Sequence, residues 1–366
     1  MTFSHLDVEL MRRAFALARR GEGGVEPNPM VGCLIARETQ VLGEGWHEQF
    51  GGPHAEVNAL AAAGEAANDA TMYVTLEPCC HQGKTPPCTQ AVLSAGIRRV
   101  AVAQRDPFPQ VDGGGIRRLR EAGIQVDVGL LENEAKTLTA PYRKLIDTGH
   151  PWVIAKWAMT LDGKIAASHG DSRWISNEAS RRVVHRIRGR VDAIMVGRRT
   201  AAADDPLLTA RPPGPRTAAR IVLDSNASLC LQSQMVRTAR QIPTLVTVGP
   251  QADHDAVQRL RDDGCDVLTS PEGSPTERLT WLLKQLGKRR MTNVLVEGGG
   301  TLLGTLLDAR SIDEIHAFIA PKIVGGVDAQ TALAGIGFAN IADALRIHDP
   351  IVEQLDGDVY IHGRLR

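Results

Sequence analysis

Short apolar runs alternate with amphipathic stretches along the first 150 residues of the chain. Runs rich in Val, Ile and other strand-forming side chains predict strands, and Ala-rich or charge-interleaved stretches between them predict helices. The predicted strands span residues 30–37, 41–46, 71–76, 99–104 and 125–128. The predicted helices span residues 55–63, 89–95, 114–122 and 132–146, and Pro141 should kink or break the last of them. This order is typical of an α/β unit in which helices cover a sheet.

The alternation restarts after the stretch "DTGHPW" at residues 147–152. Further strands are predicted at residues 152–158, 193–196, 220–223, 244–248, 294–296 and 315–319. Helices fall between several of them, for example at residues 178–189 and 276–286. Since domains hold roughly 100–200 residues each, the 366 residues are expected to form two α/β domains, residues 1–147 and residues 148–366.

The N-terminal stretch predicts an amphipathic helix, with Asp7 as N-cap and Gly21 just past its end. Its apolar residues are interleaved with charges, so it lacks the continuous apolar segment of a signal peptide. No window holds 18 apolar residues, and no membrane span is therefore expected. We expect a cytoplasmic protein that has no membrane partner.

Composition narrows the class of partner. The formal net charge is zero, from 42 Lys plus Arg and 42 Asp plus Glu, and aromatic residues make up 4% of the chain. A surface for a nucleic-acid strand needs a basic excess and uses stacking aromatic side chains. The composition therefore argues against a nucleic-acid partner and favours a small-molecule partner, for which a local basic pocket suffices.

Three of the six cysteines crowd into "EPCCHQGKTPPC" at residues 77–88. Without a secretion signal, such a cluster indicates a metal or catalytic site rather than a disulfide scaffold. Upstream, "GGPHAEVNAL" places His54 and Glu56 at the start of a predicted helix. Residues two apart on a regular helix point to nearly opposite sides. The two can share a site only if His54 belongs to the turn or to the first helical position.

A His-x-Glu pair followed by two cysteines is the residue set of zinc deaminases, in which one His and two Cys hold the ion and the Glu moves protons. Three protein ligands leave the fourth position to water, whose pKa zinc lowers to about 7. On this hypothesis His54, Cys79 and Cys88 are the ligands. Glu56 would take a proton from the water and deliver it to the departing amine.

One alternative is a closed structural zinc site, completed by Cys80 or His81. Structural sites commonly use paired short Cys spacings, which makes the catalytic hypothesis the stronger one. The loop between the two cysteine ligands would then be lid-like, and its His81, Lys84 and Thr85 could hydrogen-bond substrate. Lys84 is equally compatible with a solvated surface charge.

Long motifs resemble a known family. "EPCCHQGKTPPC", together with "EPNPMVGC" and "HAEVNAL", is similar to the deaminase half of the bifunctional riboflavin-biosynthesis deaminase-reductase family. "KWAMTLDGKIA", "GDSRWIS", "VGRRTAAADDPLLTAR", "VEGGGTLLG" and "APKIVGG" resemble its reductase half in the same order. The resemblance implies a cytidine-deaminase-like α/β/α N-terminal domain and a dihydrofolate-reductase-like α/β C-terminal domain. Cys80 departs from the family pattern, in which a small polar residue is expected, and adds an oxidisable thiol beside a ligand.

The family's activities are implied with it. The deaminase half would hydrolyse the 2-amino group of 2,5-diamino-6-(5-phosphoribosylamino)pyrimidin-4-one. The reductase half would then use NADPH to reduce the ribosyl side chain, giving 5-amino-6-(5-phosphoribitylamino)uracil. The cofactors would be one Zn²⁺ per chain and NADPH, and the family suggests a homodimer or a larger homo-oligomer.

The resemblance also implies site residues. It assigns the zinc to His54, Cys79 and Cys88, the proton transfer to Glu56, and a place beside the pyrimidine or ribose to Asn28. The implied contacts to NADPH are Ala158, Trp174, Thr200, Asp204, Gly299, Gly300, Thr301, Leu302, Leu303, Gly304 and Thr305. The implied contacts to the substrate of the reductase are Lys156, Ser172, Arg188, Leu208, Arg211 and Glu297.

Physical reasoning supports part of this set. The glycine turn in "VEGGGTLLG" runs from a strand into a helix, whose first N–H groups can bind phosphate. It is not a Rossmann fingerprint, because Leu303 stands where the third glycine would be needed. Arg188 and Arg211 suit a sugar phosphate, and the alternative for Arg188 is that it is one charge of a basic helix. Arg198 and Arg199 follow a strand end and could meet the 2′-phosphate of NADPH.

Three other functions are weighed against this one. A nucleic-acid base deaminase with an accessory domain conflicts with the zero net charge. A non-catalytic, zinc-stabilised binding or scaffold protein would have a filled fourth zinc position. A single-activity enzyme with one decayed half conflicts with the presence of the motifs of both halves.

Overall fold

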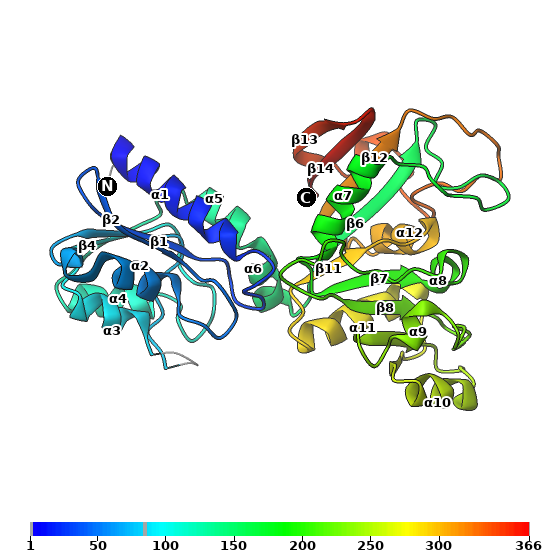
Figure 1. The fold of residues 1–366 in the computed structure, drawn as a ribbon, viewed down its shortest axis with the longest axis horizontal. Coiled ribbons are helices and arrows are strands. Elements are labelled where there is room, and N and C mark those ends of the chain that lie inside the picture. Colours follow the sequence, from blue (N-terminus) through cyan, green and yellow to red (C-terminus); the bar gives the residue numbers. More distant parts are fainter. Residues whose placement is uncertain (1–2, 83–85, 366) are drawn as a thin grey trace. The chain divides into compact units, whose positions relative to one another are not determined.

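The computed structural model describes residues 3–82 and 86–365 of the chain. The chain folds into two compact units, Met1–Gly149 and His150–Arg366, which are called unit 1 and unit 2 (Figure 1). The sequence placed the corresponding boundary between residues 147 and 148. Each unit has its own sheet and its own hydrophobic core, so each is described by itself.

Unit 1 is built on a five-stranded sheet of order β2-β1-β3-β4-β5. Its strands are β1 Gly32–Arg37, β2 Gln40–Trp46, β3 Thr71–Val74, β4 Arg99–Val102 and β5 Gln125–Val128. β1 pairs antiparallel with β2 and β3, whereas β3, β4 and β5 run parallel. The cysteine-rich loop follows β3, and Glu77 N in that loop donates to Gln104 O just beyond β4, at 3.0 Å.

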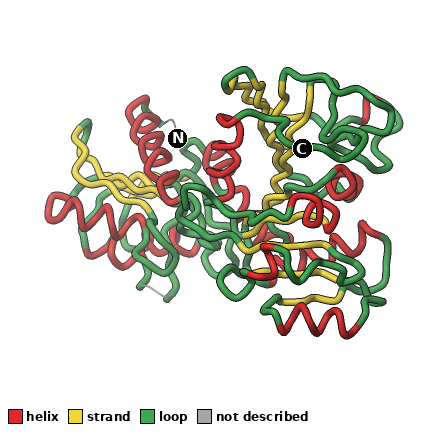
Figure 2. The backbone as a smooth tube through the Cα atoms, turned by 45° about the vertical axis from the view of Figure 1, so that its right-hand side comes forward, coloured by secondary structure: helices red, strands yellow, loops and turns green. Residues whose placement is uncertain are grey.

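Helices cover both faces of this sheet (Figure 2). They are α1 His5–Ala18, α2 Ala55–Ala63, α3 Cys88–Ser94, α4 Gly114–Glu121, α5 Glu132–Leu138 and α6 Ala140–Thr148, with 3-10 turns at Arg19–Gly21 and Gly64–Ala67. One core packs α1 and α5 against one face, and a second core packs α2, α3 and α4 against the other. The α/β/α arrangement that the resemblance implies is confirmed. The predicted break near Pro141 is also confirmed, because α5 ends at Leu138 and Pro141 lies in the first turn of α6.

The start of α1 differs from the expectation. Ser4, and not Asp7, is the N-cap residue: the Ser4 hydroxyl accepts from Asp7 N, and the Asp7 carboxylate accepts from Ser4 N. This reciprocal capping box moves the helix start three residues earlier. The other Asp7 oxygen accepts from Arg99 Nη1 at 2.6 Å and from the Tyr73 hydroxyl at 2.9 Å. Asp7 therefore also ties α1 to the sheet.

Unit 2 is built on a nine-stranded sheet of order β10-β9-β8-β7-β11-β6-β12-β14-β13. Its strands are β6 Trp152–Thr160, β7 Ala193–Gly197, β8 Ala219–Leu223, β9 Thr244–Val248, β10 Asp266–Thr269, β11 Asn293–Val296, β12 Glu314–Ala320, β13 Ile347–Leu355 and β14 Asp358–Leu365. The strands from β10 to β12 run parallel, and β14 and β13 add an antiparallel edge.

Helices again pack on both faces of the parallel part. They are α7 Glu178–Arg188, α8 Arg198–Asp204, α9 Gln234–Arg237, α10 His254–Asp262, α11 Pro275–Lys288 and α12 Gly300–Asp308, with a 3-10 turn at Ile341–Asp343. α7, α9 and α10 cover one face, and α11 and α12 cover the other. Successive strand residues alternate between the two cores: Ile154 packs toward α7, whereas Val153 and Ala155 pack toward α11 and α12. The expected second α/β domain is confirmed.

The hairpin of β13 and β14 is the main element that the sequence pattern missed. β13 is an edge strand whose residues are mostly exposed, so it shows no buried apolar run. It also contains Asp349 and Pro350, which argue against a strand. The pairing shifts register between His348 and Ile351, so an irregularity in the edge accommodates the proline. In the described part of the chain, no helix is long and apolar enough to cross a bilayer.

Candidate active sites

In unit 1, close packing of α2 on the sheet positions His54 and Glu56. Gly43 and Gly45 of β2 face α2, and a Cβ at Gly45 would lie only 2.3 Å from Ala59 N. The glycines and the Ala-rich sequence of α2 therefore allow the helix to approach the strand closely. His54 is the N-cap of α2, with extended backbone at φ −76° and ψ 163°, and is not part of the regular helix. Glu56 lies in the first turn and is 3% exposed.

The loop after β3 positions the two cysteines. Cys79 follows Glu77 and Pro78, and Cys88 is the first residue of α3. The backbone N–H of Cys88 donates to Cys79 Sγ at 3.3 Å, and Thr89 N donates to Cys79 O at 3.1 Å. These two contacts hold the two ends of the loop together. Cys88 is fully buried.

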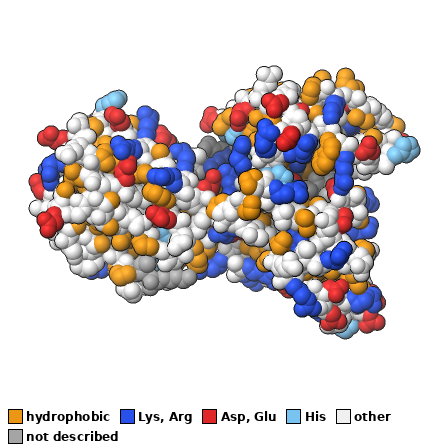
Figure 3. All heavy atoms as spheres, in the orientation of Figure 1, with side chains coloured by type: hydrophobic (Ala, Val, Ile, Leu, Met, Phe, Trp, Pro, Cys, Tyr) orange, Lys and Arg blue, Asp and Glu red, His pale blue; other side chains and the backbone are white. Residues whose placement is uncertain are grey.

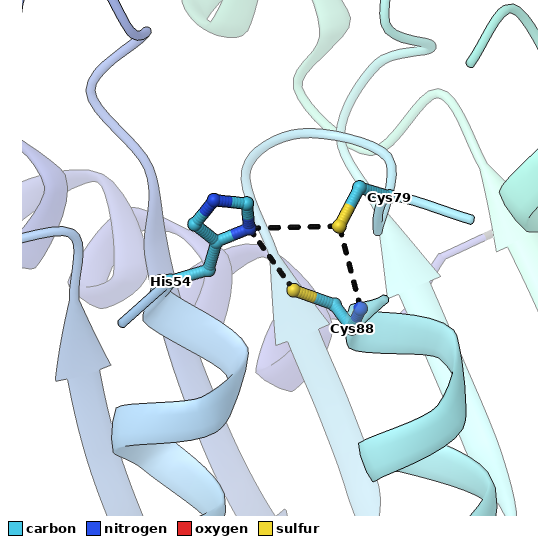
Figure 4. Close-up of side chains that lie close together, drawn as sticks. All are labelled: His54, Cys79 and Cys88. Carbon is cyan, nitrogen blue, oxygen red and sulfur yellow. Dashed lines mark hydrogen bonds between the residues drawn. The ribbon is translucent and has the colours of Figure 1, made fainter. Parts of the chain in front are cut away.

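Three side chains converge on one point (Figure 4). His54 Nδ1 lies 3.1 Å from Cys88 Sγ and 3.6 Å from Cys79 Sγ, and all three ligand atoms lie within 4.8 Å of one another. Ligand atoms at the corners of a zinc tetrahedron, with bonds of about 2.0–2.3 Å, are roughly 3.3–3.8 Å apart. The separations therefore fit a zinc ion held by one His and two Cys, with its fourth position left to another group.

The neighbours Cys80 and His81 do not belong to this group. The Cys80 thiol lies 4.0 Å from Gln110 O, and the His81 ring lies 6.1 Å from the ring of Phe108. Of the loop residues expected to hydrogen-bond substrate, Lys84 and Thr85 lie outside the described residues. Within the described chain, the arrangement thus matches the open, catalytic form of the site better than the closed, structural form.

Burial and mutual hydrogen bonding shift the pKa values of the group. The pKa of Cys79 is lowered to about 4, chiefly because the Cys88 thiol donates a hydrogen bond to it. The pKa of Cys88 is raised, because its proton is shared with Cys79 and because the side chain is buried. Burial raises the pKa of Glu56 to about 7, against the lowering effect of His54. One thiolate beside an imidazole is a donor set that zinc prefers.

Glu77 is a buried residue beside the cysteine loop whose contacts the sequence did not reveal. Its carboxylate is 3% exposed and accepts hydrogen bonds from four backbone N–H groups, at distances of 2.9–3.3 Å. The donors are Asp106, Gly113, Gly115 and Ile116. Two residues before Cys79, this carboxylate joins the cysteine loop to the segment that follows β4. No local pattern signals the contact, because the donors lie 29–39 residues away.

His47 is a second residue of the site that was missed. It is buried, and its Nδ1 lies 2.9 Å from Pro53 O, while its Nε2 lies 3.1 Å from Asn28 Nδ2. Burial lowers the pKa of His47, which favours the neutral ring. In that form Nδ1–H donates to Pro53 O and Nε2 accepts from Asn28. The orientation of Asn28, a predicted substrate contact, is thereby fixed beside the His54 ring, which lies 5.3 Å from the His47 ring.

Unit 2 contains a pocket of about 990 Å³ at the carboxyl ends of its parallel strands. It brings together most of the reductase residues implied by the resemblance. Those that line it are Lys156, Ala158, Ser172, Trp174, Arg188, Thr200, Asp204, Leu208, Arg211, Glu297, Gly299, Gly300, Thr301, Leu302 and Thr305. Leu303 and Gly304 do not line it: the Leu303 side chain is fully buried in the core, and Gly304 packs tightly against Ala334 O.

A buried ion cluster lies at one end of the pocket. Arg188 binds Glu297 through two hydrogen bonds, Nε to Oε1 at 2.6 Å and Nη2 to Oε2 at 2.9 Å. Lys156 Nζ lies 3.4 Å from Glu297 Oε2. Burial raises the pKa of Glu297, but the charges of Arg188 and Lys156 outweigh it and hold the pKa at about 2. Arg188 thus enters the site as half of a bidentate ion pair and not as a free phosphate ligand.

The glycine turn fits a dinucleotide. Gly299 N donates to Thr200 Oγ1 at 3.2 Å, and α12 begins at Gly300. A Cβ at Gly300 would lie 2.2 Å from Thr331 O, so this position is closed to larger residues. The first turn of α12 lines the pocket, and the N–H groups at the start of a helix favour a phosphate.

The remaining predicted residues lie around the rim. Trp174 is 64% exposed and stacks with the guanidinium of Arg181, 4.6 Å from its ring centre. Arg173 Nη2 donates to Asp204 O at 2.6 Å. Ser172 is half-buried, Arg211 is exposed, and Leu208 is buried with a left-handed backbone at φ 54°. On the face drawn in Figure 3, basic and acidic side chains are interspersed over each unit, in keeping with the zero net charge.

Comparisons with known proteins cover both units. The family model of the cytidine and deoxycytidylate deaminase zinc-binding region matches residues 4–104, and that of the RibD C-terminal domain matches residues 151–361. The riboflavin biosynthesis protein RibD of Actinobacillus pleuropneumoniae is 40% identical over 355 residues, which are 97% of this chain and 94% of the relative.

Two solved structures match this chain over 99% of its length and over 99% of their own chain length. Form 1 of Acinetobacter baumannii RibD has a TM-score of 0.87 at 36% identity. The diaminohydroxyphosphoribosylaminopyrimidine deaminase/5-amino-6-(5-phosphoribosylamino)uracil reductase of Thermotoga maritima has a TM-score of 0.86 at 32% identity. The similarity therefore extends over the zinc-site unit and the pocket unit alike.

Proposed function

Because the chain belongs to the RibD family of riboflavin biosynthesis proteins, we propose that its two units perform two successive steps on one pyrimidine. The chain is a bifunctional enzyme with a deaminase domain and a reductase domain. Residues 1–147 hydrolyse the 2-amino group of 2,5-diamino-6-(5-phosphoribosylamino)pyrimidin-4-one. Residues 148–366 then reduce the ribosyl side chain to give 5-amino-6-(5-phosphoribitylamino)uracil.

The convergence of His54, Cys79 and Cys88 beside the buried Glu56 is the observation that carries the deaminase assignment. A bound zinc ion supplies a Lewis acid that lowers the pKa of water to about 7. Glu56 lies in the first turn of α2, two residues from His54, where its carboxylate can accept a proton and return it to the leaving nitrogen. Asn28, oriented by His47, offers its amide oxygen to the substrate.

In the reductase domain, the pocket residues bind and orient NADPH and the substrate. NADPH, when bound, supplies the hydride. The N–H groups at the start of α12 and the Thr200 hydroxyl, which line the pocket, would hold the dinucleotide phosphates. The cluster of Lys156, Glu297 and Arg188 faces the same pocket and orients the sugar through fixed charges. The proposed ligands of the sugar phosphate are Arg211 and Ser172, which line the same pocket.

Zinc removal tests the division of labour. The enzyme is supplied with the diaminopyrimidinone ribosyl phosphate and NADPH, and ammonia release and nicotinamide absorbance are followed together. Treatment with a zinc chelator should abolish ammonia release, and re-addition of Zn²⁺ should restore it. NADPH oxidation on the already deaminated substrate should continue in the zinc-free enzyme. Ammonia release that survives full removal of zinc would contradict the assignment of unit 1.

The enzyme is also proposed to form a homodimer or a larger homo-oligomer through the edge of the unit 2 sheet. β13 is an edge strand, and its Ile351 and Val352 are 53% and 63% exposed. An edge strand leaves backbone N–H and C=O groups unpaired, and exposed apolar residues on it favour association with another chain.

Light scattering coupled to gel filtration should therefore show a dimer or larger species for the wild type. A double variant with Ile351→Lys and Val352→Lys should shift to the monomer. Val327→Lys is the matched control, because Val327 is 96% exposed but lies outside β13. A wild type that is monomeric at micromolar concentration, or a double variant that stays oligomeric, would contradict this interface.

A cytoplasmic location is proposed from the chemistry of the thiols. All six cysteines are free, and Cys79 and Cys88 must stay reduced to hold zinc. Reduced thiols persist in the cytosol, whereas oxidising compartments form disulfides.

A further inference from the structure

The pocket of unit 2 extends well beyond the ion cluster and the glycine turn. The strand order places β6, β11, β7 and β8 side by side, and strands are spaced about 4.8 Å apart, so the end of β8 lies roughly 14 Å from that of β6. The pocket lining includes Ser225 and Asn226 after β8, Val248 at the end of β9, and Arg278 in the first turns of α11. The far end of the pocket is thus formed by β8, β9 and α11.

Arg278 is the cation of this far end. It is half-buried, its Nη1 lies 3.5 Å from Ser225 Oγ, and the same atom would lie 3.3 Å from a Cβ at Gly249. The guanidinium is therefore held over the ends of β8 and β9.

Arg278 has no carboxylate partner within 4 Å among the described residues. Its neighbour Glu277 is engaged in the capping box of α11, accepting from Ser274 N and Oγ at 2.8 Å each. Arg188, in contrast, is neutralised by Glu297. A partly buried guanidinium without a counter-charge favours an anionic ligand.

We propose that Arg278, oriented by Ser225, binds the 2′-phosphate of the adenosine half of NADPH and so makes the reductase prefer NADPH to NADH. The inference rests on the proposed NADPH-dependent reduction. The nicotinamide must reach the sugar beside Lys156 and Glu297, and the phosphates occupy the glycine turn. The adenosine of an extended dinucleotide therefore lies at the far end, where the planar guanidinium can bind a phosphate dianion through two N–H groups.

Arg198 and Arg199, which the sequence suggested for this role, are placed differently. Both are exposed and begin α8, directly after β7, which is the strand next to β11 and its glycine turn. No hydrogen bond or ion pair holds either side chain among the described residues. Their position is closer to that of the dinucleotide phosphates, whereas Arg278 lies one to two strands further from the reacting end.

Titration calorimetry with two nucleotides tests the proposal without relying on turnover. The probes are adenosine 2′,5′-bisphosphate and adenosine 5′-monophosphate, which differ by the 2′-phosphate. Arg278→Ala should weaken binding of the bisphosphate roughly tenfold to a hundredfold and leave binding of the monophosphate unchanged. Arg278→Lys keeps the charge but loses the bidentate contact, so its affinity for the bisphosphate should lie between those of the wild type and Arg278→Ala.

The controls separate local from global effects. Lys284→Ala changes an exposed cation on the same helix and should bind both nucleotides like the wild type. Thermal melting shows whether each variant is folded. Arg278→Gln keeps most of the side chain and replaces Arg278→Ala in the test if Arg278→Ala folds poorly. Arg198→Ala and Arg199→Ala are expected to bind both nucleotides with less than a threefold change in the ratio of the two affinities.

Three results would overturn the inference. Unchanged bisphosphate binding in Arg278→Ala and Arg278→Gln would exclude Arg278, and a selective loss in Arg198→Ala or Arg199→Ala would transfer the role to α8. Both results leave the proposed reductase function intact, which NADPH oxidation by the wild type checks in parallel. A wild type that neither distinguishes the nucleotides nor oxidises NADPH would instead overturn the reductase assignment and the inference with it.

Discussion

Replacement of Glu56 by Gln should abolish ammonia release from the diaminopyrimidinone substrate while the zinc stays bound. Gln has nearly the same shape as Glu but cannot accept and return a proton at neutral pH. Acid–base groups of this kind contribute typically 10²–10⁴-fold to a rate, and we expect a loss of that order. Glu56 is 3% exposed, so bulk water cannot easily replace it. Ammonia release, bound zinc and thermal melting are measured on the same preparation.

The downstream step sharpens this test. If reduction depends on prior deamination, Glu56→Gln should also fail to oxidise NADPH with the starting substrate, yet should oxidise it normally with the deaminated compound. Glu65→Gln is the matched control, since Glu65 is an exposed residue just past α2. Normal ammonia release by Glu56→Gln would show that the assigned proton transfer is wrong. Loss of zinc from this variant would show that Glu56 supports the ligands instead.

Removing the Glu297 carboxylate should have the largest effect on unit 2. Glu297→Ala leaves Arg188 and Lys156 in a buried site without their counter-charge, and breaking a buried ion pair in this way costs roughly 3–5 kcal/mol. NADPH oxidation on the deaminated substrate should fall with the loss of the oriented charges. Calorimetry should show a lower melting temperature for unit 2, while ammonia release by unit 1 persists. Glu178→Ala, an exposed change on α7, is the control.

The same cluster predicts a pH dependence. The pKa of Glu297 is held at about 2, below the ordinary value of 4.5 that it regains in the unfolded chain. A depressed carboxyl pKa contributes stability that is fully present above the unfolded value and is lost as the pH falls through the folded value. The stabilisation should therefore fade between about pH 4.5 and pH 2 in the wild type. In Glu297→Gln this contribution should be absent, and equal acid sensitivity of the two proteins would contradict the role of the cluster.

Much of the fold follows from local pattern. The strand at 125–128, the strand at 244–248 and the helix at 55–63 have the bounds that the sequence predicted. Central parallel strands such as 244–248 are buried on both faces and show a mostly apolar run in the sequence. The exposed edge strand β13 carries no such run, and for that reason the C-terminal hairpin was missed.

The zinc-site hypothesis also arose from sequence, because it depends on rare residue types at turn positions. His54 precedes a helix, Cys79 and Cys88 bracket one loop, and the three match the residue set of zinc deaminases, which suggested that they meet. The structure gathers these three and leaves Cys80 aside. The assignment of their roles stays a prediction that the zinc and Glu56 experiments decide.

The sequence by itself determined the class of fold, the existence of two units and the residue types of both sites. Apolar periodicity, glycine turns and cysteine spacing are local properties, because each depends only on residues that are near one another in the sequence. The partners of the buried charged side chains of the pocket were decided by the tertiary structure. Arg188 lies in a helix with several other arginines, and only the packing of α7 near the end of β11 pairs it with Glu297, 109 residues away. Charge partners depend on which chain segments the core brings together, and that information is spread over the whole sequence.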